Sequence, residues 1–290
     1  MLAINSEFLD IISPMKARCS YKAVELPVNR DEAHAALIKW MAKGALGGVT
    51  TWGSGIAHRE GLRLYWLGDE VPDELAGIAE TLVEEDWTHH WQGALNRVRI
   101  SERITLTPSW LAEPAKPDGI DILLDPGMAF GAGDHPTTRM CSRFLDKMAS
   151  GGFPEGRVLD VGAGTGVLSI LAAKVGANMV DALDIDPFCH ASCERNIILN
   201  GVEGKVTPLL LSLDLLSGEY DLIIANIVAG QLAHLAADIL NLIKPGGKVL
   251  LSGFKEEKAA EIGACFKPLV EGERLTEEGW CALMMVSATP

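Results

Sequence analysis

A glycine-rich turn that follows an apolar strand is the feature of this sequence with the clearest chemical meaning. Residues 158–168 read VLDVGAGTGVL, in which Gly162, Gly164 and Gly166 have GxGxG spacing and Asp160 stands just before them. In the dinucleotide fingerprint GxGxxG, the last glycine lets the helix pack on the strand while the helix N-terminus faces a pyrophosphate. S-adenosylmethionine has no phosphate, and a GxGxG turn preceded by an acid lets the backbone approach a zwitterionic amino acid and an adenosine. The spacing therefore favours S-adenosylmethionine as the cofactor.

A second acidic position follows at the end of the next expected strand, residues 179–186. Asp184 stands about 20 residues past the glycine turn, where an acidic side chain in this topology meets ribose hydroxyls. Asp186 precedes Pro187 and is therefore expected to cap the next helix instead. Both nucleotide classes use such a carboxylate, so it does not discriminate between them. Two acids that simply end a strand at a solvated edge are the alternative.

A Gly- and Pro-rich loop, residues 125–138, precedes the cofactor strand. Long irregular loops of this kind usually carry function. Thr137 and Thr138 are expected to cap a helix that starts near Arg139 while their hydroxyls face the cofactor; a plain cap and turn is the alternative. His135 is the one imidazole in this loop, and a structural role suits it at least as well as proton transfer.

The apolar strand 221–227 ends in a polar residue, Asn226. In an open α/β sheet, ligands bind beyond the carboxyl ends of the strands, which is where Asn226 falls. Its amide could accept a hydrogen bond from an incoming amine and donate one to the cofactor carboxylate. The Asn-Pro-Pro-aromatic signature is absent, which argues against a planar exocyclic amide or amine as the acceptor.

From Ile120 onward, strands and helices alternate in a way that predicts an α/β domain with a parallel sheet and helices on both faces. The expected strands are 121–124, 158–162, 179–185, 206–211, 221–227 and 247–253, with a last pair within 272–288. The N-terminal part predicts a small α+β module with a strand at 21–28, a helix at 31–43, short strands up to 62–67 and a second helix from Pro72 to about Glu84.

Composition limits the function classes. The net charge of −14 without a basic stripe argues against direct nucleic-acid binding and favours a basic protein partner, although acidity for solubility alone is the simpler explanation.

No apolar run approaches the roughly 20 residues that span a bilayer, so no membrane partner is expected. The N-terminus lacks a signal layout, which predicts a cytoplasmic protein. The six cysteines are expected to be reduced thiols, and Cys189, His190 and Cys193 lack a second ligand cluster, so no metal is expected.

Taken together, these residues resemble the PrmA family, the bacterial methyltransferases of large-subunit ribosomal protein eleven. The likeness runs from about Glu84 to Ala288. Its most specific parts are the Trp motif at 86–91, Pro108-Ser109-Trp110, the loop 125–138, Ala225-Asn226-Ile227, Leu251-Ser252-Gly253 and Glu278-Gly279-Trp280-Cys281. The resemblance implies a Rossmann-like class I methyltransferase sheet with a small N-terminal α+β domain.

The resemblance also implies domains and roles. Residues 1–84 would recognise the substrate, 85–119 would be a linker and 120–290 the S-adenosylmethionine-dependent methyltransferase domain. The methyl acceptors would be lysine or N-terminal amines of the ribosomal protein. Contacts to S-adenosylmethionine are implied for Thr138, Gly162, Asp184 and Asn226, and the turn itself adds Asp160, Gly164 and Gly166. No side chain is assigned as catalytic, because desolvation beside a sulfonium lowers the pKa of a lysine without a dedicated base.

The sequence departs from the family pattern in three places. Ala132 stands where the loop usually carries Thr, and Asp134 precedes the His. The N-terminal module runs from its expected second helix directly into residues 85–87, which leaves out a strand of the family. Three alternatives follow: a class I methyltransferase of another protein or a small-molecule amine, an NAD(P)-dependent oxidoreductase, which the glycine spacing argues against, and a binding protein that lost turnover.

Overall fold

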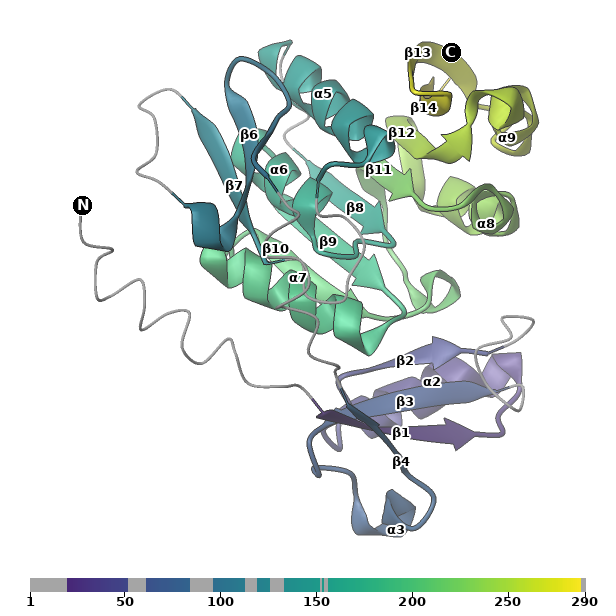
Figure 1. The fold of residues 1–290 in the computed structure, drawn as a ribbon. Helices are drawn as coiled ribbons and strands as arrows, with labels where there is room; N and C mark the ends of the chain where they lie inside the picture. Colours follow the sequence, from purple (N-terminus) through teal and green to yellow (C-terminus); the bar gives the residue numbers. More distant parts are fainter. Residues whose placement is uncertain are drawn as a thin grey trace, which may run out of the picture.

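The computed structural model describes residues 20–51, 61–83, 96–112, 119–125, 133–151, 153 and 156–287. Its largest sheet has seven strands in the order β10-β9-β8-β11-β12-β14-β13 (Figure 1). The strands from β10 to β12 are mutually parallel, and β14 and β13 add an antiparallel edge. The bounds are β8 (Arg157–Val161), β9 (Met179–Asp184), β10 (Val206–Leu210), β11 (Tyr220–Asn226), β12 (Ile243–Lys255), β13 (Val270–Glu277) and β14 (Trp280–Val286).

Helices cover both faces of this sheet. Side chains of successive strand residues point to opposite faces, so Val158 packs into one apolar cluster and Leu159 into the other. The first cluster includes residues of α5 (Pro136–Ser150), α6 (Val167–Val175) and α7 (Pro187–Leu199). The second includes residues of α8 (Ala229–Leu242) and α9 (Ala259–Cys265). The predicted α/β class, with its Rossmann-like sheet, is therefore confirmed.

One expected strand of this sheet belongs elsewhere. β7 (Ile120–Leu124) pairs in parallel with β6 (Ile104–Pro108), which pairs with β5 (Val98–Arg99), and the three form a separate sheet. The buried side chains of Ile122 and Leu124 pack into the same core as α5 and α6. Alternating hydrophobicity identified residues 121–124 as a strand but carried no information about its partner.

The N-terminal module is a four-stranded antiparallel sheet with the order β2-β3-β1-β4. Helix α2 (Arg30–Met41) begins with a capping box between Asn29 and Glu32, and it packs on the sheet through an edge-to-face contact of Trp40 with Trp66. The strands are β1 (Ser20–Leu26), β2 (Gly47–Thr50), β3 (Leu62–Leu67) and β4 (Glu80–Val83).

The prediction of a helix from Pro72 to about Glu84 is wrong. Helix α3 covers only Asp73–Ala76, and Gly77 is its C-cap. β4 follows and pairs with β1, with Ser20 opposite Val83. The strand that we expected to be missing before residues 85–87 is therefore present. Residues 1–19, the Trp motif at 86–91 and residues 113–118 of the expected linker lie outside the described residues. The expected domain boundaries stay a prediction.

The edge of the N-terminal sheet meets the edge of the large sheet. Gly48 forms an isolated parallel bridge with Leu211, just past the carboxyl end of β10, and the backbone N–H of Thr50 donates to Oγ of Ser212 at 2.7 Å. A Cβ on Gly47 would stand 1.8 Å from the carbonyl oxygen of Leu210, so this approach requires a glycine. In Figure 1 the module lies below the large sheet with β2 nearest to it.

Candidate cofactor site

The glycine turn joins β8 to α6 and needs left-handed backbone at all three glycines. The φ angles are 72° at Gly162, 55° at Gly164 and 78° at Gly166, which is also the N-cap of α6. Residues with a Cβ rarely adopt such angles. The N–H groups of Gly162 and Ala163 both donate to the carbonyl of Leu183, at 2.9 and 3.0 Å. The turn is thereby held against the carboxyl end of β9.

Asp184 ends β9 beside this turn. Its Oδ2 accepts a hydrogen bond from the backbone N–H of Gly164 at 2.9 Å, and its Oδ1 accepts one from the N–H of Asp186 at 3.0 Å. Burial raises the pKa of this carboxyl, while the backbone donors oppose the shift. Asp186 caps α7 by accepting from the N–H of Phe188 at 2.8 Å, as predicted. Asp186 therefore caps α7, whereas the carboxylate of Asp184 contacts the glycine turn.

Asp160 lies beneath the turn and is 1% exposed. Its Oδ2 accepts a hydrogen bond from Oγ of Ser169 on α6 at 2.6 Å. Burial raises the pKa of Asp160 to about 6, and hydrogen bonds from Ser169 limit the rise. The carboxyl therefore ties β8 to α6 under the glycines, and its contact with a cofactor stays a prediction.

Asn226 and Thr138 each carry a buried oxygen without a partner in the part of the chain that the structure describes. Asn226 ends β11, opposite Ser252 of β12, and Thr138 lies in the first turn of α5. Buried polar atoms in folded proteins almost always have a hydrogen-bond partner, so an orphaned one calls for a ligand or water. These two oxygens, Asn226 Oδ1 and Thr138 Oγ1, are the most direct sign in the structure that a polar ligand completes this site.

Ile227 brings the end of β11 against the glycine turn. A Cβ on Gly162 would stand 2.4 Å from Cγ2 of Ile227, and a Cβ on Gly253 would stand 2.2 Å from the carbonyl oxygen of Ile227. Gly253 has a φ of 96°. The two glycines therefore leave space for the segment after Asn226. Ile227 and Gly253 belong to the motifs Ala225-Asn226-Ile227 and Leu251-Ser252-Gly253, but nothing in the sequence alone indicates this packing role.

The loop before α5 differs from the expectation. The helix begins at Pro136, not near Arg139, and His135 rather than a threonine is its N-cap. Nδ1 of His135 lies 2.7 Å from Oγ1 of Thr137. The backbone N–H of Thr137 donates to the same Nδ1 at 3.4 Å. Proline suits the first helical position because its missing N–H would have no partner there. Burial lowers the pKa of His135, and Ala132 lies outside the described residues.

No group of three or more His, Cys, Asp or Glu side chains that could hold a metal occurs within the described residues. Cys189, His190 and Cys193 lie on α7, where Cys193 is buried in the core. Over the same described ranges, no helix is long and apolar enough to cross a membrane.

A GxGxG turn after β8, an acid at the end of β9 and orphaned oxygens at the end of β11 and at the start of α5 define a class I S-adenosylmethionine-dependent methyltransferase. The described residues fit that cofactor, because the turn between β8 and α6 has no side chain at its three glycines and the buried oxygens of Asn226 and Thr138 lack partners among the described residues. The sequence model of the family "Ribosomal protein L11 methyltransferase (PrmA)" matches residues 68–288, and the chain belongs to this family. This membership decides against the oxidoreductase alternative.

Individual relatives of the chain carry the same family name. The chain is 40% identical over 210 residues to the ribosomal protein L11 methyltransferase of Geobacter sp. (strain M21), covering 71% of this chain and 68% of that protein. It is 38% identical over 214 residues to that of Pseudomonas aeruginosa (strain LESB58), covering 73% and 70%. A crystal structure of ribosomal protein L11 methylase from Lactobacillus delbrueckii subsp. bulgaricus superposes with a TM-score of 0.59 at 28% identity, covering 68% of this chain and 100% of that one.

Proposed function

We propose that this enzyme transfers methyl groups from S-adenosylmethionine to lysine or N-terminal amines of ribosomal protein L11. The observation that carries the cofactor part is the pair of orphaned oxygens, Asn226 Oδ1 and Thr138 Oγ1. The acceptor rests on the names of the relatives, which are ribosomal protein L11 methyltransferases. An acceptor in the ribosome implies that the enzyme acts in the cytoplasm.

Different residues would bind different parts of S-adenosylmethionine. S-adenosylmethionine supplies a methyl group on a sulfonium sulfur. Asp184 would accept hydrogen bonds from ribose hydroxyls, and its position at the end of β9 beside Gly164 supports this role. Gly162, Gly164 and Gly166 keep the turn free of side chains, and Asp160 fixes it from below. Asn226 and Thr138 would bind the amino-acid part of the cofactor or the acceptor amine.

The acceptor amine must reach the site uncharged. With a reference pKa of about 10.4, a lysine is almost entirely protonated at neutral pH. A desolvated site next to a positive charge lowers that pKa. Nδ1 of His135 is the acceptor of the Thr137 N–H, and burial lowers the pKa of the imidazole. His135 therefore suits a positioning role in its neutral form, and positioning of the reactants is the main catalytic contribution left to the protein.

We further propose that residues 1–84 recognise the acceptor, that 85–119 link the two parts and that 120–290 carry the methyl-transfer site. The bridge between Gly48 and Leu211 places the module at the carboxyl end of β10, the edge of the sheet where the cofactor residues also lie. The net charge of −14 would attract a basic acceptor protein and repel the phosphates of free nucleic acid.

A second candidate is the same chemistry on a different protein or on a small-molecule amine. The family match begins at residue 68, so β1, α2, β2 and β3 lie outside it. These elements form most of the module that would choose the acceptor. A divergent module with a retained cofactor site is the pattern expected if the substrate has changed.

A labelling experiment separates the two candidates. Purified protein is incubated with S-adenosylmethionine carrying a labelled methyl group and with L11, other ribosomal proteins or small amines, and modified positions are located by mass spectrometry. We expect label on lysine or N-terminal amines of L11, with none in the Asn226→Ala control. Intact cofactor binding without labelling of L11 would discard this acceptor and keep the methyltransferase.

A further inference from the structure

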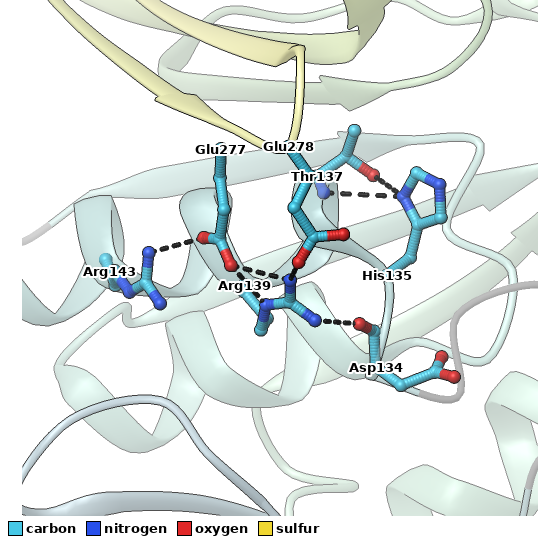
Figure 2. A network of polar contacts seen from close by, with 7 residues as sticks. All are labelled: Asp134, His135, Thr137, Arg139, Arg143, Glu277 and Glu278. Atoms are coloured by element: carbon cyan, nitrogen blue, oxygen red, sulfur yellow. Dashed lines mark hydrogen bonds and ion pairs between the residues drawn. The ribbon is translucent and has the colours of Figure 1, made fainter.

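The hairpin that ends the large sheet is tied to α5 by a row of ion pairs (Figure 2). Arg139, Arg143 and Lys147 recur every fourth residue, so they share one face of α5. Arg143 pairs with Glu277 at 2.5 Å and Lys147 pairs with Glu273 at 2.7 Å. The basic side chains of these two pairs are 43% and 68% exposed, and pairs that reach solvent contribute little to stability.

Arg139 differs from the other two basic residues because its guanidinium joins three segments. Its Nε donates to Oε1 of Glu277 at 2.7 Å, and its Nη2 contacts Oε1 of Glu278 at 2.7 Å. Its Nη1 donates to the backbone carbonyl of Asp134, directly before the N-cap of α5. The side chains of Arg139 and Glu277 are only 18% and 21% exposed. A planar guanidinium with donors in fixed directions holds three acceptors in one relative geometry.

The hairpin holds the same loop at a second point. Trp280, which follows the turn at Glu278 and Gly279, packs edge-to-face on the ring of His135 with centroids 4.7 Å apart. On Trp280, Nζ of Lys255 lies 3.9 Å from the ring centroid. Asp134 and His135 are therefore fixed by Arg139 and by Trp280, and three residues further on stands Thr138 with its orphaned hydroxyl.

We propose that Arg139, oriented by Glu277, is a positioning residue for the cofactor site, and that the tip of the β13–β14 hairpin sets the geometry of the segment that carries Asp134 and His135 and leads into Thr138 at the start of α5. This inference rests on the proposed placement of S-adenosylmethionine. The contact with the loop goes through the carbonyl of Asp134, so it does not depend on the side chain at position 134.

The test compares two arginine substitutions on one helix face. Arg139→Gln removes the contact with the loop, whereas Arg143→Gln removes one ion pair to the same Glu277 and leaves the loop contact in place. The dissociation constant of S-adenosylhomocysteine is measured by calorimetry, together with the melting temperature of each variant. We expect R139Q to weaken binding about tenfold or more, because a displaced Thr138 hydroxyl would lose a hydrogen bond to the ligand, and one such bond to a charged group is equivalent to about tenfold in affinity. R143Q should bind within twofold of the parent protein.

A purely structural role would make affinity follow melting temperature, so R139Q and R143Q would weaken binding in proportion to their loss of stability. That result, or binding by R139Q within twofold of the parent, would overturn the proposal. If R139Q does not fold, Arg139→Lys keeps the charge but cannot hold three acceptors in fixed directions, and it should also weaken binding. S-adenosylhomocysteine binding needs no acceptor, so failure of L11 as the substrate would leave this result unaffected.

Discussion

The backbone N–H of Gly164 donates to Oδ2 of Asp184 at 2.9 Å and thereby joins the middle of the glycine turn to the end of β9. Asp184→Asn replaces one of two carboxylate oxygens by an amide nitrogen, so one of the backbone donors from Gly164 and Asp186 loses its acceptor. The substitution also removes the negative charge that would accept hydrogen bonds from the ribose hydroxyls. Because a hydrogen bond to a charged group contributes about 1.5–3 kcal/mol, we expect about 10- to 100-fold weaker S-adenosylhomocysteine binding. Calorimetry measures this, and Asp186→Asn, which keeps a helix cap, should bind normally. Equal affinities for all three proteins would refute the ribose assignment.

Asn226 should matter for ligand binding and not for stability. Its Oδ1 has no partner among the described residues, so Asn226→Ala removes no internal hydrogen bond of that atom and should melt at or above the parent temperature. Binding of S-adenosylhomocysteine should nevertheless fall about tenfold or more, the effect of losing a hydrogen bond to a charged group.

The matched control for Asn226 is its neighbour across the strand pair. Oγ of Ser252 donates to the carbonyl of Cys281 at 2.8 Å in the buried core. Ser252→Ala should therefore destabilise the fold by about 1–3 kcal/mol while leaving affinity near that of the parent. A marked drop in melting temperature for Asn226→Ala with unchanged affinity would show that the asparagine is structural.

Asp160 should make the stability of the fold depend on pH. Burial raises its pKa from 3.8 to about 6, so the folded protein binds this proton more tightly than the unfolded chain. Stability from the protonated carboxyl is present below about pH 4 and is lost as pH rises to about 6, in all about 3 kcal/mol. Urea unfolding across this range should show Asp160→Asn gaining about that much relative to the parent. Parallel stability curves would contradict the assignment.

The contact between the two sheets should affect the acceptor and not the cofactor. Gly47→Ala places a Cβ against the carbonyl of Leu210, where only 1.8 Å separates the two positions, so the N-terminal module must shift. We expect a raised KM for the acceptor protein and an unchanged dissociation constant for S-adenosylhomocysteine. Gly77→Ala, where a Cβ meets nothing within 4 Å, is the control within the same module. Equal acceptor KM values for the two variants would argue against recognition by this module.

Local sequence signals predicted the elements whose residues specify their own conformation. The strand–turn–helix around Gly162 and the cap at Asp186 depend on neighbouring residues and are where the sequence placed them. The segment after Pro72 was misassigned because β4 is stabilised by pairing with β1, about 60 residues away along the chain. β7 was placed in the wrong sheet for the same reason, since its partner β6 carries no recognisable signal of that pairing.

The candidate site likewise contains residues that local sequence signals identify and residues that only long-range contacts bring together. The candidate residues that follow strands could be found because parallel strands end at one edge of the sheet. Arg139, Glu277 and Trp280 could not, because the ion pair joins residues 138 positions apart and depends on the final hairpin folding back to α5. The motif at 278–281 was visible in the sequence, but only the fold connects it to His135.

The most direct test of the cofactor site is a crystal structure with S-adenosylhomocysteine bound. We expect the ligand beyond the carboxyl ends of β8, β9 and β11, with its ribose on Asp184 and with polar atoms within hydrogen-bond distance of Asn226 Oδ1 and Thr138 Oγ1. A ligand bound elsewhere, or one that leaves both oxygens without a partner, would contradict it.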